Sequence, residues 1–404
     1  MDAKSIGTQI SKLRRRCSLT QAQLAARLHI SDKTISRWES GIGFPEVTQF
    51  PALAEIFGVT VDYLMTGERK GIAVAGNILA NIVKNVDRYP ALGMLGNITD
   101  MTQAVGGCAP NTAIDLAKID RNIPLSVIGK IGNDEYGRFI LSVLSRYGID
   151  CEQVSLSATK PTGVSDVVVN PTGERTFFYA SGANGEFSPE DVDAHSLNCV
   201  VLHIGYILLL DLFDKEDAVY GTVMARFLHD LQEKGIRTSV DVMSDSPLGY
   251  KEKVIPALRY CNYAIMDEKE SCSLTDLPPT TPDGKINLES IRKTAIFMAG
   301  CGVRNKVIIH CKQACFCYDV PTESFTAVPA LDIPREEIRG SVGAGDAFSA
   351  GCLYGIYKNY DDTRLLEFAS AAAASVLFCE NSTDGMLDKN QLEKLEERYG
   401  RKTL

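Results

Sequence analysis

The chain has 404 residues, more than one ordinary hydrophobic core supports, so two or three domains are expected. Hydrophobic residues make up 45% and charged residues 23% of the sequence, a composition that excludes a disordered or fibrous protein. Residues 1–70 hold 10 Lys and Arg against 7 Asp and Glu, a net charge of +3, and the other residues hold 32 against 44, a net charge of −12. A basic N-terminal region joined to an acidic remainder indicates that only the N-terminal region binds nucleic acid.

The opening segment has no apolar run typical of a signal peptide, and no stretch reaches the roughly eighteen apolar residues of a membrane helix. We therefore expect a cytoplasmic protein without a membrane partner. The longest apolar run, residues 368–379, is rich in Ala and predicts a buried helix. The twelve cysteines are scattered, which favours reduced thiols. A metal site formed by Cys311, Cys315 and Cys317 is an alternative. These cysteines lie in VIIHCKQACFCYD, residues 307–319, which predicts two short strands around a turn, and they lack paired C-x-x-C spacing, so we expect them to be core residues.

Five short helical patterns follow one another in residues 1–66. Thr20 is expected to begin the second helix with a capping box, and Ser31 to cap the third. In the third helix Ile35 and Trp38 are spaced to point inward, which leaves the polar and basic residues on the outer face. The region is thus expected to be an all-α domain.

Two helices joined by a tight turn, the second with polar and basic residues near its start, form the geometry that reads the DNA major groove. The string TQAQLAARLHISDKTISRWESGIGFP, residues 20–45, resembles the helix-turn-helix domain of the phage-repressor (Cro-type) family over its whole length. The resemblance implies a homodimer that binds double-stranded DNA through residues 1–66. The implied DNA-binding residues are Gln21, at a phosphate, and Lys33, Thr34, Ser36 and Arg37, facing the groove. The alternative is a helical module that serves protein contacts only, with its basic residues solvated.

Residues 67–71 are short, polar and charged, and we expect them to link this domain to a second one over residues 72–404. In the second domain strand-like runs alternate with helix-compatible segments, which predicts right-handed βαβ units around a mostly parallel sheet. The expected strands are residues 125–128, 200–204, 238–242, 263–266 and 306–309, each followed by a helix-compatible segment. Residues 163–169 and 175–180 look like an added β-hairpin, a candidate lid over the sheet edge where ligands bind.

The strongest chemical signal is the segment RGSVGAGDAFSAGCLYGI, residues 339–356. Its glycines allow backbone N–H groups to turn toward an anion, and the apolar helix that follows, expected to begin near Ala347, favours negative charge at its start. Asp346 at that terminus is placed to take a proton from a hydroxyl that attacks a phosphoryl group. The alternative is structural: a tight strand-to-helix turn in which Asp346 caps the helix.

Residues 73 to about 395 resemble the ribokinase-like (phosphofructokinase-B) sugar kinases. GSVGAGDAF resembles the C-terminal signature of that family, and VGGCAPNTAIDLAKI, residues 105–119, resembles the N-terminal one. Further matches are residues 132–137, 162–164, 182–184 and 267–270. The resemblance implies an α/β ribokinase-like domain with a small β lid that phosphorylates a sugar hydroxyl, with ATP and Mg²⁺ as cofactors.

Residue by residue, the resemblance makes Asp346 the catalytic base. The implied anion hole consists of the backbone amides of Gly343, Ala344 and Gly345. The implied sugar-binding residues are Asn81, Gly106, Gly107 and Asn111. Asp267 and Glu270 match an N-x-x-E motif with Asp in place of Asn and would organise Mg²⁺ through water, which suits a cation that keeps several waters. For these two residues the alternative is a solvated helix start.

Four departures from the family pattern bear on activity. Asn81 replaces an Asp that grips sugar hydroxyls, and residues 108–110 differ in the first signature. Gly340 replaces an Asp that supports a monovalent-cation site, which puts potassium activation in doubt. Lys312 and Cys315 replace glycines near the nucleotide; Lys312 would either pair with ATP phosphates or block the close backbone approach that glycine permits.

Two functional interpretations follow. The first is an active sugar kinase whose attached DNA-binding domain regulates genes. The second is a sugar-sensing transcription regulator whose kinase-like domain has weak or no turnover. A third interpretation is a metabolic kinase whose helix-turn-helix domain no longer functions, and it predicts no salt-sensitive DNA binding.

Overall fold

The computed structural model describes residues 2–243 and 249–404. Two compact units divide the chain: Met1–Gly71 with Asp193–Val200, and Ile72–Val192 with Val201–Leu404. Residues 67–71, expected as a linker, and residues 193–200, expected in the second domain, both group with the first unit. Within the described part of the chain, no helix has the length and apolar character needed to cross a membrane.

The first unit consists of five short helices, as the sequence predicts. They are α1 (Ala3–Arg16), α2 (Gln21–Arg27), α3 (Asp32–Glu39), α4 (Gln49–Phe57) and α5 (Val61–Thr66). Thr20 begins α2 with the predicted capping box, and the Ser31 side chain accepts from the backbone N–H of Thr34 at the start of α3. Ile35 and Trp38 are buried against apolar residues of the other helices, which makes α3 one wall of a small core.

A buried ion pair ties α1 to the end of α3. The Arg14 guanidinium donates to both carboxylate oxygens of Glu39, with Nε–Oε1 at 2.5 Å and Nη2–Oε2 at 2.9 Å, and the Gln21 amide donates to Oε2 at 2.8 Å. Burial opposes ionisation of Glu39, but the hydrogen bonds from Arg14 and Gln21 outweigh it and hold the pKa of the carboxyl below its ordinary value. The network therefore joins three helices through one carboxylate.

The second unit is built on a nine-stranded sheet in the order β15-β14-β13-β12-β11-β8-β1-β4-β5. The strands are β1 (Ile72–Gly76), β4 (Leu125–Gly132), β5 (Val154–Ser157), β8 (Val201–Ile207), β11 (Arg237–Val242), β12 (Tyr263–Asp267), β13 (Lys306–His310), β14 (Ala314–Asp319) and β15 (Ser324–Pro329). Pairing is parallel from β5 to β13 and antiparallel for the last two. The two short strands around a turn predicted over residues 307–319 are confirmed as β13 and β14, which are joined by three residues. The helix-compatible segment expected after residues 306–309 is therefore wrong, since a helical crossover to a parallel strand needs a dozen or so residues.

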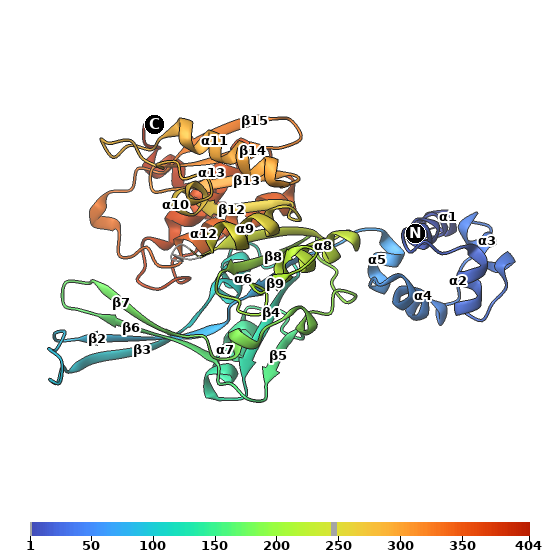
Figure 1. Cartoon of the computed structure of the whole chain (residues 1–404), viewed down its shortest axis with the longest axis horizontal. Helices are drawn as coiled ribbons and strands as arrows, with labels where there is room; N and C mark the ends of the chain where they lie inside the picture. Colours follow the sequence, from blue (N-terminus) through green and yellow to red (C-terminus); the bar gives the residue numbers. More distant parts are fainter. Residues whose placement is uncertain (1, 244–248) are drawn as a thin grey trace. The chain divides into compact units, whose positions relative to one another are not determined.

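Helices cover both faces of this sheet (Figure 1). On one face pack α6 (Cys108–Ile119), α12 (Ala344–Lys358) and α13 (Asp362–Val376), and on the other pack α8 (Val223–Glu233), α9 (Tyr250–Leu258) and α11 (Leu288–Cys301). The remaining helices are α7 (Glu135–Arg146), α10 (Glu268–Ser273), α14 (Lys389–Glu393) and α15 (Leu395–Tyr399). Because the central strands are buried on both faces, they are almost continuously apolar. Helix α13 contains most of the buried helix predicted over residues 368–379.

A four-stranded sheet in the order β3-β2-β6-β7 projects from the large sheet (Figure 1). Its strands are β2 (Leu79–Val86), β3 (Ile98–Gly106), β6 (Gly163–Val169) and β7 (Arg175–Ala180). The hairpin β6–β7 has the predicted bounds, but β2 and β3 complete the sheet and escaped prediction, since β2 continues almost directly from β1. The two-stranded ribbon of β9 (Glu216–Asp217) and β10 (Gly221–Thr222) precedes α8.

Two of the three clustered cysteines belong to the core, as expected, and Cys311 is only half-buried. Cys315 and Cys317 on β14 are buried among apolar residues that include Cys352 of α12. Cys311 lies in the preceding turn, where its thiol donates to the carbonyl of Ala314. Burial raises the pKa of all three clustered thiols, so they remain protonated at neutral pH.

Candidate functional site

Asp346 lies in the first turn of α12, which begins at Ala344, three residues earlier than the sequence predicts. Gly343 supplies the left-handed N-cap with φ at 81°, and a Cβ at this position would come within 2.5 Å of the carbonyl oxygen of Ser382. Only glycine satisfies both conditions without strain. The Asp346 side chain is 5% exposed, so a carboxyl group is buried beside the positive end of the helix dipole.

Two donors hold the Asp346 carboxylate. The Tyr206 hydroxyl donates to Oδ1 at 2.6 Å, and the Asn111 amide donates to Oδ2 at 2.9 Å. The Asn111 oxygen in turn accepts from the Ser382 hydroxyl at 3.1 Å. Burial raises the pKa of Asp346 to about 6, although both hydrogen bonds favour the ionised form. The group is therefore largely ionised at neutral pH and can accept a proton.

The four-stranded sheet of β3, β2, β6 and β7 is the lid. The predicted sugar-binding residues lie close together where this lid joins the large sheet. Gly107 has φ at 93°, and a Cβ there would come within 2.2 Å of the Asn77 carbonyl oxygen, so this close approach requires glycine. A Cβ at Gly106 would lie 2.4 Å from the Asn81 amide nitrogen, which places the Asn81 side chain directly against this residue. Helix α6 starts at Cys108, directly after Gly107, and places Asn111 within hydrogen-bond distance of Asp346.

Residues of the other segments that match the family hold the lid in place through hydrogen bonds. Asn184 fixes the chain after β1: its Oδ1 accepts from the N–H of Ile78 at 2.8 Å and its Nδ2 donates to the Ile78 carbonyl at 2.9 Å. Asp134 caps α7 and accepts from the Thr162 N–H at 2.7 Å. These residues thus hold the ends of lid strands where the lid joins the large sheet.

Asp267 and Glu270 form a capping box at the start of α10. The Glu270 N–H donates to Asp267 Oδ1 and the Asp267 N–H donates to Glu270 Oε2, each at 2.7 Å. Asp241, at the end of β11, faces them: burial, and next the charge of Glu270, raise its pKa well above the ordinary value. Across the residues that the structure describes, no three His, Cys, Asp or Glu side chains are grouped to hold a metal directly. This donor chemistry fits Mg²⁺ held through water, and that role remains a prediction.

Lys312 lies on the exposed turn between β13 and β14, two residues after His310, which pairs with Asp267. Its carbonyl accepts from the Lys402 ammonium group at 3.3 Å. Gly340 packs against the segment after α13, where a Cβ would come within 3.0 Å of the Cys379 carbonyl oxygen. The nucleotide role of Lys312 stays a prediction.

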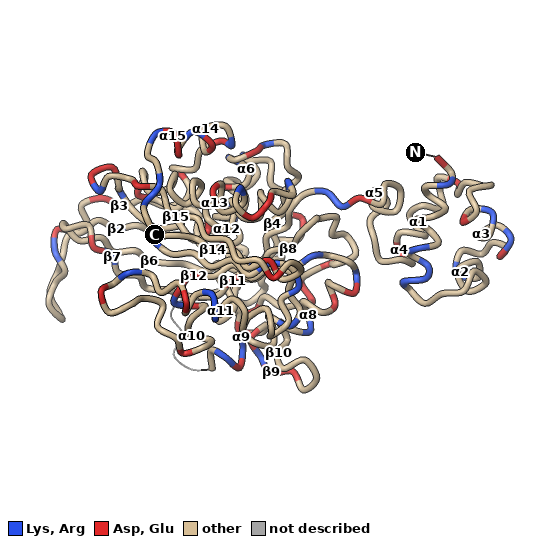
Figure 2. Tube along the Cα trace, turned by 90° about the horizontal axis from the view of Figure 1, so that it is seen from above, with Lys and Arg blue, Asp and Glu red and all other residues tan. Residues whose placement is uncertain are grey.

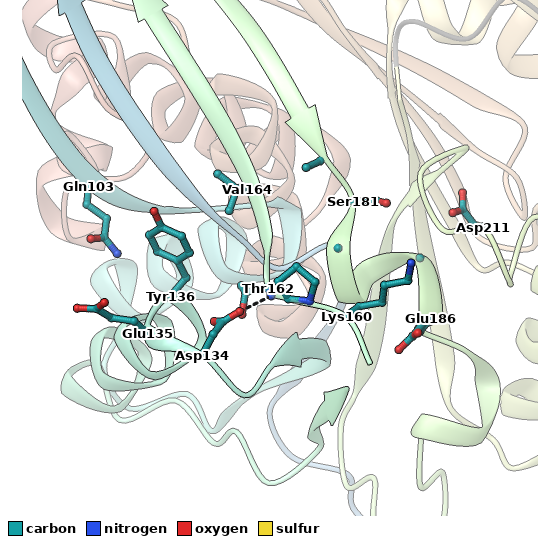
Figure 3. Close-up of a pocket in the computed structure, with 14 residues that line it drawn as sticks. Gln103, Asp134, Glu135, Tyr136, Lys160, Thr162, Val164, Ser181, Glu186 and Asp211 are labelled. Atoms are coloured by element: carbon teal, nitrogen blue, oxygen red, sulfur yellow. Dashed lines mark hydrogen bonds between the residues drawn. The ribbon is translucent and has the colours of Figure 1, made fainter. Parts of the chain in front are cut away.

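A cavity of about 800 Å³ opens between the lid and the start of α7 (Figure 3). Its lining includes Gln103 of β3, Tyr136 of α7 and Lys160, and also Thr162 and Asp134, which are joined by a hydrogen bond (Figure 3). Its lining includes none of the predicted sugar-binding residues. The cavity is therefore distinct from the cluster around Asp346.

In the first unit, Lys33, Ser36 and Arg37 are exposed on the outer face of α3, with more basic residues along α1 (Figure 2). Thr34 is half-buried, and its hydroxyl bonds to Ser31. The Gln21 side chain donates to Glu39. Three of the five predicted DNA-binding side chains are thus directed to solvent, while two are engaged at helix ends.

Four site residues escaped sequence analysis: Asn77, Tyr206, Asp241 and Ser382. The first three lie at the carboxyl ends of β1, β8 and β11, where a parallel sheet places its ligand-binding groups, and that position was the available signal. Ser382 lies in an irregular segment after α13 with no local pattern to mark it.

Asp115, one turn after Asn111 on α6, is fully buried, and among the described residues none donates to either carboxylate oxygen. Burial raises its pKa well above the ordinary value. The unfolded chain releases this proton near pH 4 while the folded chain retains it, so the carboxyl destabilises the fold increasingly as pH rises. We expect Asp115→Asn to unfold like the wild type at pH 4 and to be more stable by about 1–3 kcal/mol at pH 8.

Urea unfolding followed by far-ultraviolet circular dichroism, at both pH values, measures this difference. Asp283→Asn, which changes an exposed carboxyl, is the matched control and should show no such gain at pH 8. A stability gap for Asp115→Asn that is the same at the two pH values would contradict the raised pKa.

Comparison with known proteins adds to this geometry. Residues 69–390 match the model of the pfkB family carbohydrate kinases, and residues 10–64 match a helix-turn-helix model. The ribokinase of Schizosaccharomyces pombe is 24% identical over 307 residues, which cover 75% of this chain and 90% of that protein.

Among solved structures, Arabidopsis thaliana ribokinase complexed with ribose and ATP has a TM-score of 0.65 and 20% identity, covering 81% of this chain and 98% of that one. A ribokinase-type protein of Escherichia coli in complex with ATP and Mg²⁺ has a TM-score of 0.64 and 19% identity, covering 82% of this chain and 100% of that one. These two likenesses show the fold. With the family match over residues 69–390, the chain belongs to the pfkB carbohydrate kinases and carries a helix-turn-helix domain ahead of the kinase domain.

Proposed function

We propose that the kinase domain transfers the γ-phosphoryl group of ATP to a hydroxyl of a small sugar, with Asp346 as the base. The observation that carries this proposal is a buried carboxylate, largely ionised at neutral pH, in the first turn of a helix that follows a glycine turn. A base with a pKa somewhat below the working pH accepts a proton without being too weak to do so.

The start of α12 supports the anion hole. The first N–H groups of a helix have no partner within the helix, and the helix dipole favours negative charge there. Apart from the adjacent residues and the backbone of α12 itself, no heavy atom lies within 4 Å of the place where a Cβ at Gly345 would stand, so an anion can approach the backbone closely. ATP with Mg²⁺ supplies the phosphoryl group when bound. The amides of Gly343, Ala344 and Gly345 would stabilise charge on it, and the Ala344 N–H would then leave the Ser341 carbonyl, to which it donates at 3.3 Å. Asp267 and Glu270 would hold the cation through water.

Asn81, Gly106, Gly107 and Asn111 bind the sugar. Gly106 lies directly against the Asn81 side chain, and the Asn81 amide can both donate to and accept from a sugar hydroxyl. Asn111 is already engaged with Asp346 and Ser382, so it orients the base as well as the sugar. A screen of ATP consumption against ketoses, pentoses and nucleosides tests this proposal, and turnover of at least one sugar class is expected.

A second candidate function is a sugar sensor with weak or no turnover. The exposed Lys312 and the buried Cys315, where the family has glycines, favour it. Absence of turnover on every sugar in the screen, together with thermal stabilisation by one of them, would favour the sensor over the enzyme.

We also propose that the helix-turn-helix domain binds double-stranded DNA as a homodimer. The exposed face of α3 supports this, since Lys33 and Arg37 stand one turn apart on it. Binding should fall steeply with salt because phosphate contacts release counterions.

Arg37→Ala is expected to weaken binding to DNA from upstream of the protein's own gene by about 1–3 kcal/mol, because a side chain that reaches a base edge contributes that much. Gel shifts at several salt concentrations measure the affinity and its salt dependence. Lys293→Ala removes an exposed cation from the kinase domain and should leave binding unchanged. Equal affinity of Arg37→Ala and wild type would favour the alternative of a protein-contact module.

We propose further that sugar binding and DNA binding are coupled through residues 193–200. These residues pack with the helical unit: the Asn198 amide donates to Asp62 at 3.1 Å, and Arg69 donates to the Leu197 carbonyl at 2.7 Å. The next residue begins β8, whose other end carries Tyr206 beside Asp346. A gel shift whose midpoint moves on addition of the sugar supports the coupling, and an unchanged midpoint with a sugar known to bind opposes it.

A further inference from the structure

We propose that Tyr206 is a positioning residue that keeps the Asp346 carboxylate ionised and correctly oriented. This inference rests on the proposed kinase function. Tyr206 lies near the end of β8, and its hydroxyl meets Asp346 Oδ1 at 2.6 Å. Its own backbone N–H donates to Asn77 Oδ1 at 3.2 Å, so the residue is anchored to the end of the neighbouring strand β1.

The direction of this hydrogen bond follows from the surroundings of the phenol. Burial, and next the charge of Asp346, raise the pKa of Tyr206 well above its ordinary value. The phenol therefore keeps its proton and is the donor, and the carboxylate is the acceptor. A hydrogen bond to the charged form of an acid favours that form. Tyr206 thus opposes burial, which by itself would leave Asp346 protonated at a higher pH.

The bond also fixes where the carboxylate points. Tyr206 holds Oδ1 from β8 and Asn111 holds Oδ2 from α6, so neither oxygen can rotate freely. A carboxylate oxygen has a second lone pair, and an incoming sugar hydroxyl can donate to it without displacing either partner. A base held in place before the substrate arrives loses little entropy on reaction.

Other ionisable groups also face Asp346. Cys108 and Asp115 come from α6, and Asp241 comes from β11; each senses the Asp346 charge. The pKa of Cys108 is raised from an already high value, so this thiol stays neutral over the working range. Asp115 and Asp241 have raised pKa values and are the two groups whose titration has to be told apart from that of Asp346.

The test is the pH profile of kcat/KM for Tyr206→Phe, which removes one oxygen and keeps the ring. Loss of a hydrogen bond to a charged group should move the acid limb to higher pH and lower kcat/KM at pH 6 by about 10- to 100-fold, with much smaller loss at pH 9. A uniform loss at all pH values with an unmoved acid limb would mean a merely structural role and would overturn the proposal.

Tyr263→Phe is the matched control. Tyr263 begins β12, and its buried hydroxyl accepts from Arg237 at 2.9 Å at the opposite end of the strand from Asp267. Its removal should leave the acid limb in place. Asp115→Asn and Asp241→Asn, measured alongside, identify whether either carboxyl contributes to that limb. An acid limb that follows one of them and not Tyr206 would overturn the proposal.

A readout without turnover separates this inference from the kinase proposal. The infrared carboxylate band of Asp346, isolated by subtracting the Asp346→Asn spectrum, reports its pKa even in a protein that only senses sugar. Tyr206→Phe should raise that pKa, and an unchanged pKa would refute the positioning role whatever the screen finds. If Tyr206→Phe does not fold, fluorotyrosine at position 206, a stronger donor, should shift the band to lower pH.

Discussion

Replacing Asp346 with Asn should lower kcat by about 100- to 10,000-fold, the range that a general base contributes. The substitution keeps the size of the side chain but removes the group that accepts the proton. One of the two present donors, Tyr206 or Asn111, would then face the new amide nitrogen and lose its acceptor. The KM for the sugar should change little, because the proposed sugar-binding residues Gly106 and Gly107 are unaffected by the substitution. Steady-state kinetics on the best substrate of the screen measures both constants.

Asp115→Asn is the matched control for this experiment, since it makes the same chemical change to another buried carboxyl, on α6. It should affect stability at high pH and leave kcat at the wild-type value. A kcat for Asp346→Asn within about threefold of wild type would exclude the assigned base, since a general base contributes at least about 100-fold. It would favour the structural alternative of a helix-capping residue in a glycine turn.

Glu39→Gln should destabilise the helix-turn-helix domain by about 3–5 kcal/mol, because it leaves the Arg14 guanidinium buried without a counter-charge. The two side chains are only 11% and 8% exposed, so water cannot replace the lost partner. At about 0.05–0.15 kcal/mol per residue, a domain of this size has a total stability of roughly 3–10 kcal/mol, so the variant should be partly unfolded near physiological temperature. DNA affinity would fall with the folded fraction.

Trp38 makes this measurement specific. It is the single tryptophan of the chain, and it is buried in the helical core, so its fluorescence in urea follows this domain alone. The double variant Arg14→Met with Glu39→Leu is the control, because replacing both members of a buried ion pair by apolar residues is often neutral or stabilising. Recovery of the wild-type midpoint in the double variant is expected. A midpoint for Glu39→Gln equal to that of wild type would show that the ion pair contributes nothing.

Local patterns predicted the individual elements well where the physics is local. The Thr20 capping box and the Ser31 cap depend on hydrogen bonds that span three residues, so the sequence contains all the information they need. The hairpin of β6 and β7 was predicted with its bounds for the same reason. The start of α12 was placed three residues late, because the Gly343 turn is set by the Ser382 backbone, which lies far away in sequence.

Tertiary contacts also changed the interpretation of particular residues. Gln21 was expected at a phosphate, and its side chain lies in the Arg14–Glu39 network, which only the packing of α1 on α3 creates. Residues 193–200 look like any loop of the kinase domain, but their hydrogen bonds reach α5 and the residues after it. Neither contact can be predicted from a local sequence pattern, because the two residues that form it are far apart along the chain.

The sequence by itself determined the two-domain organisation, the helix-turn-helix pattern and the glycine turn that carries Asp346. Each of these follows from the spacing of residues within about twenty positions, where capping, turn chemistry and periodicity act. Only the tertiary structure decided that Tyr206, Asn111 and Ser382 converge on that carboxylate and that burial raises its pKa. Three distant segments have to fold around one side chain before its solvation and its hydrogen bonds are defined, and the proton affinity of Asp346 depends on both.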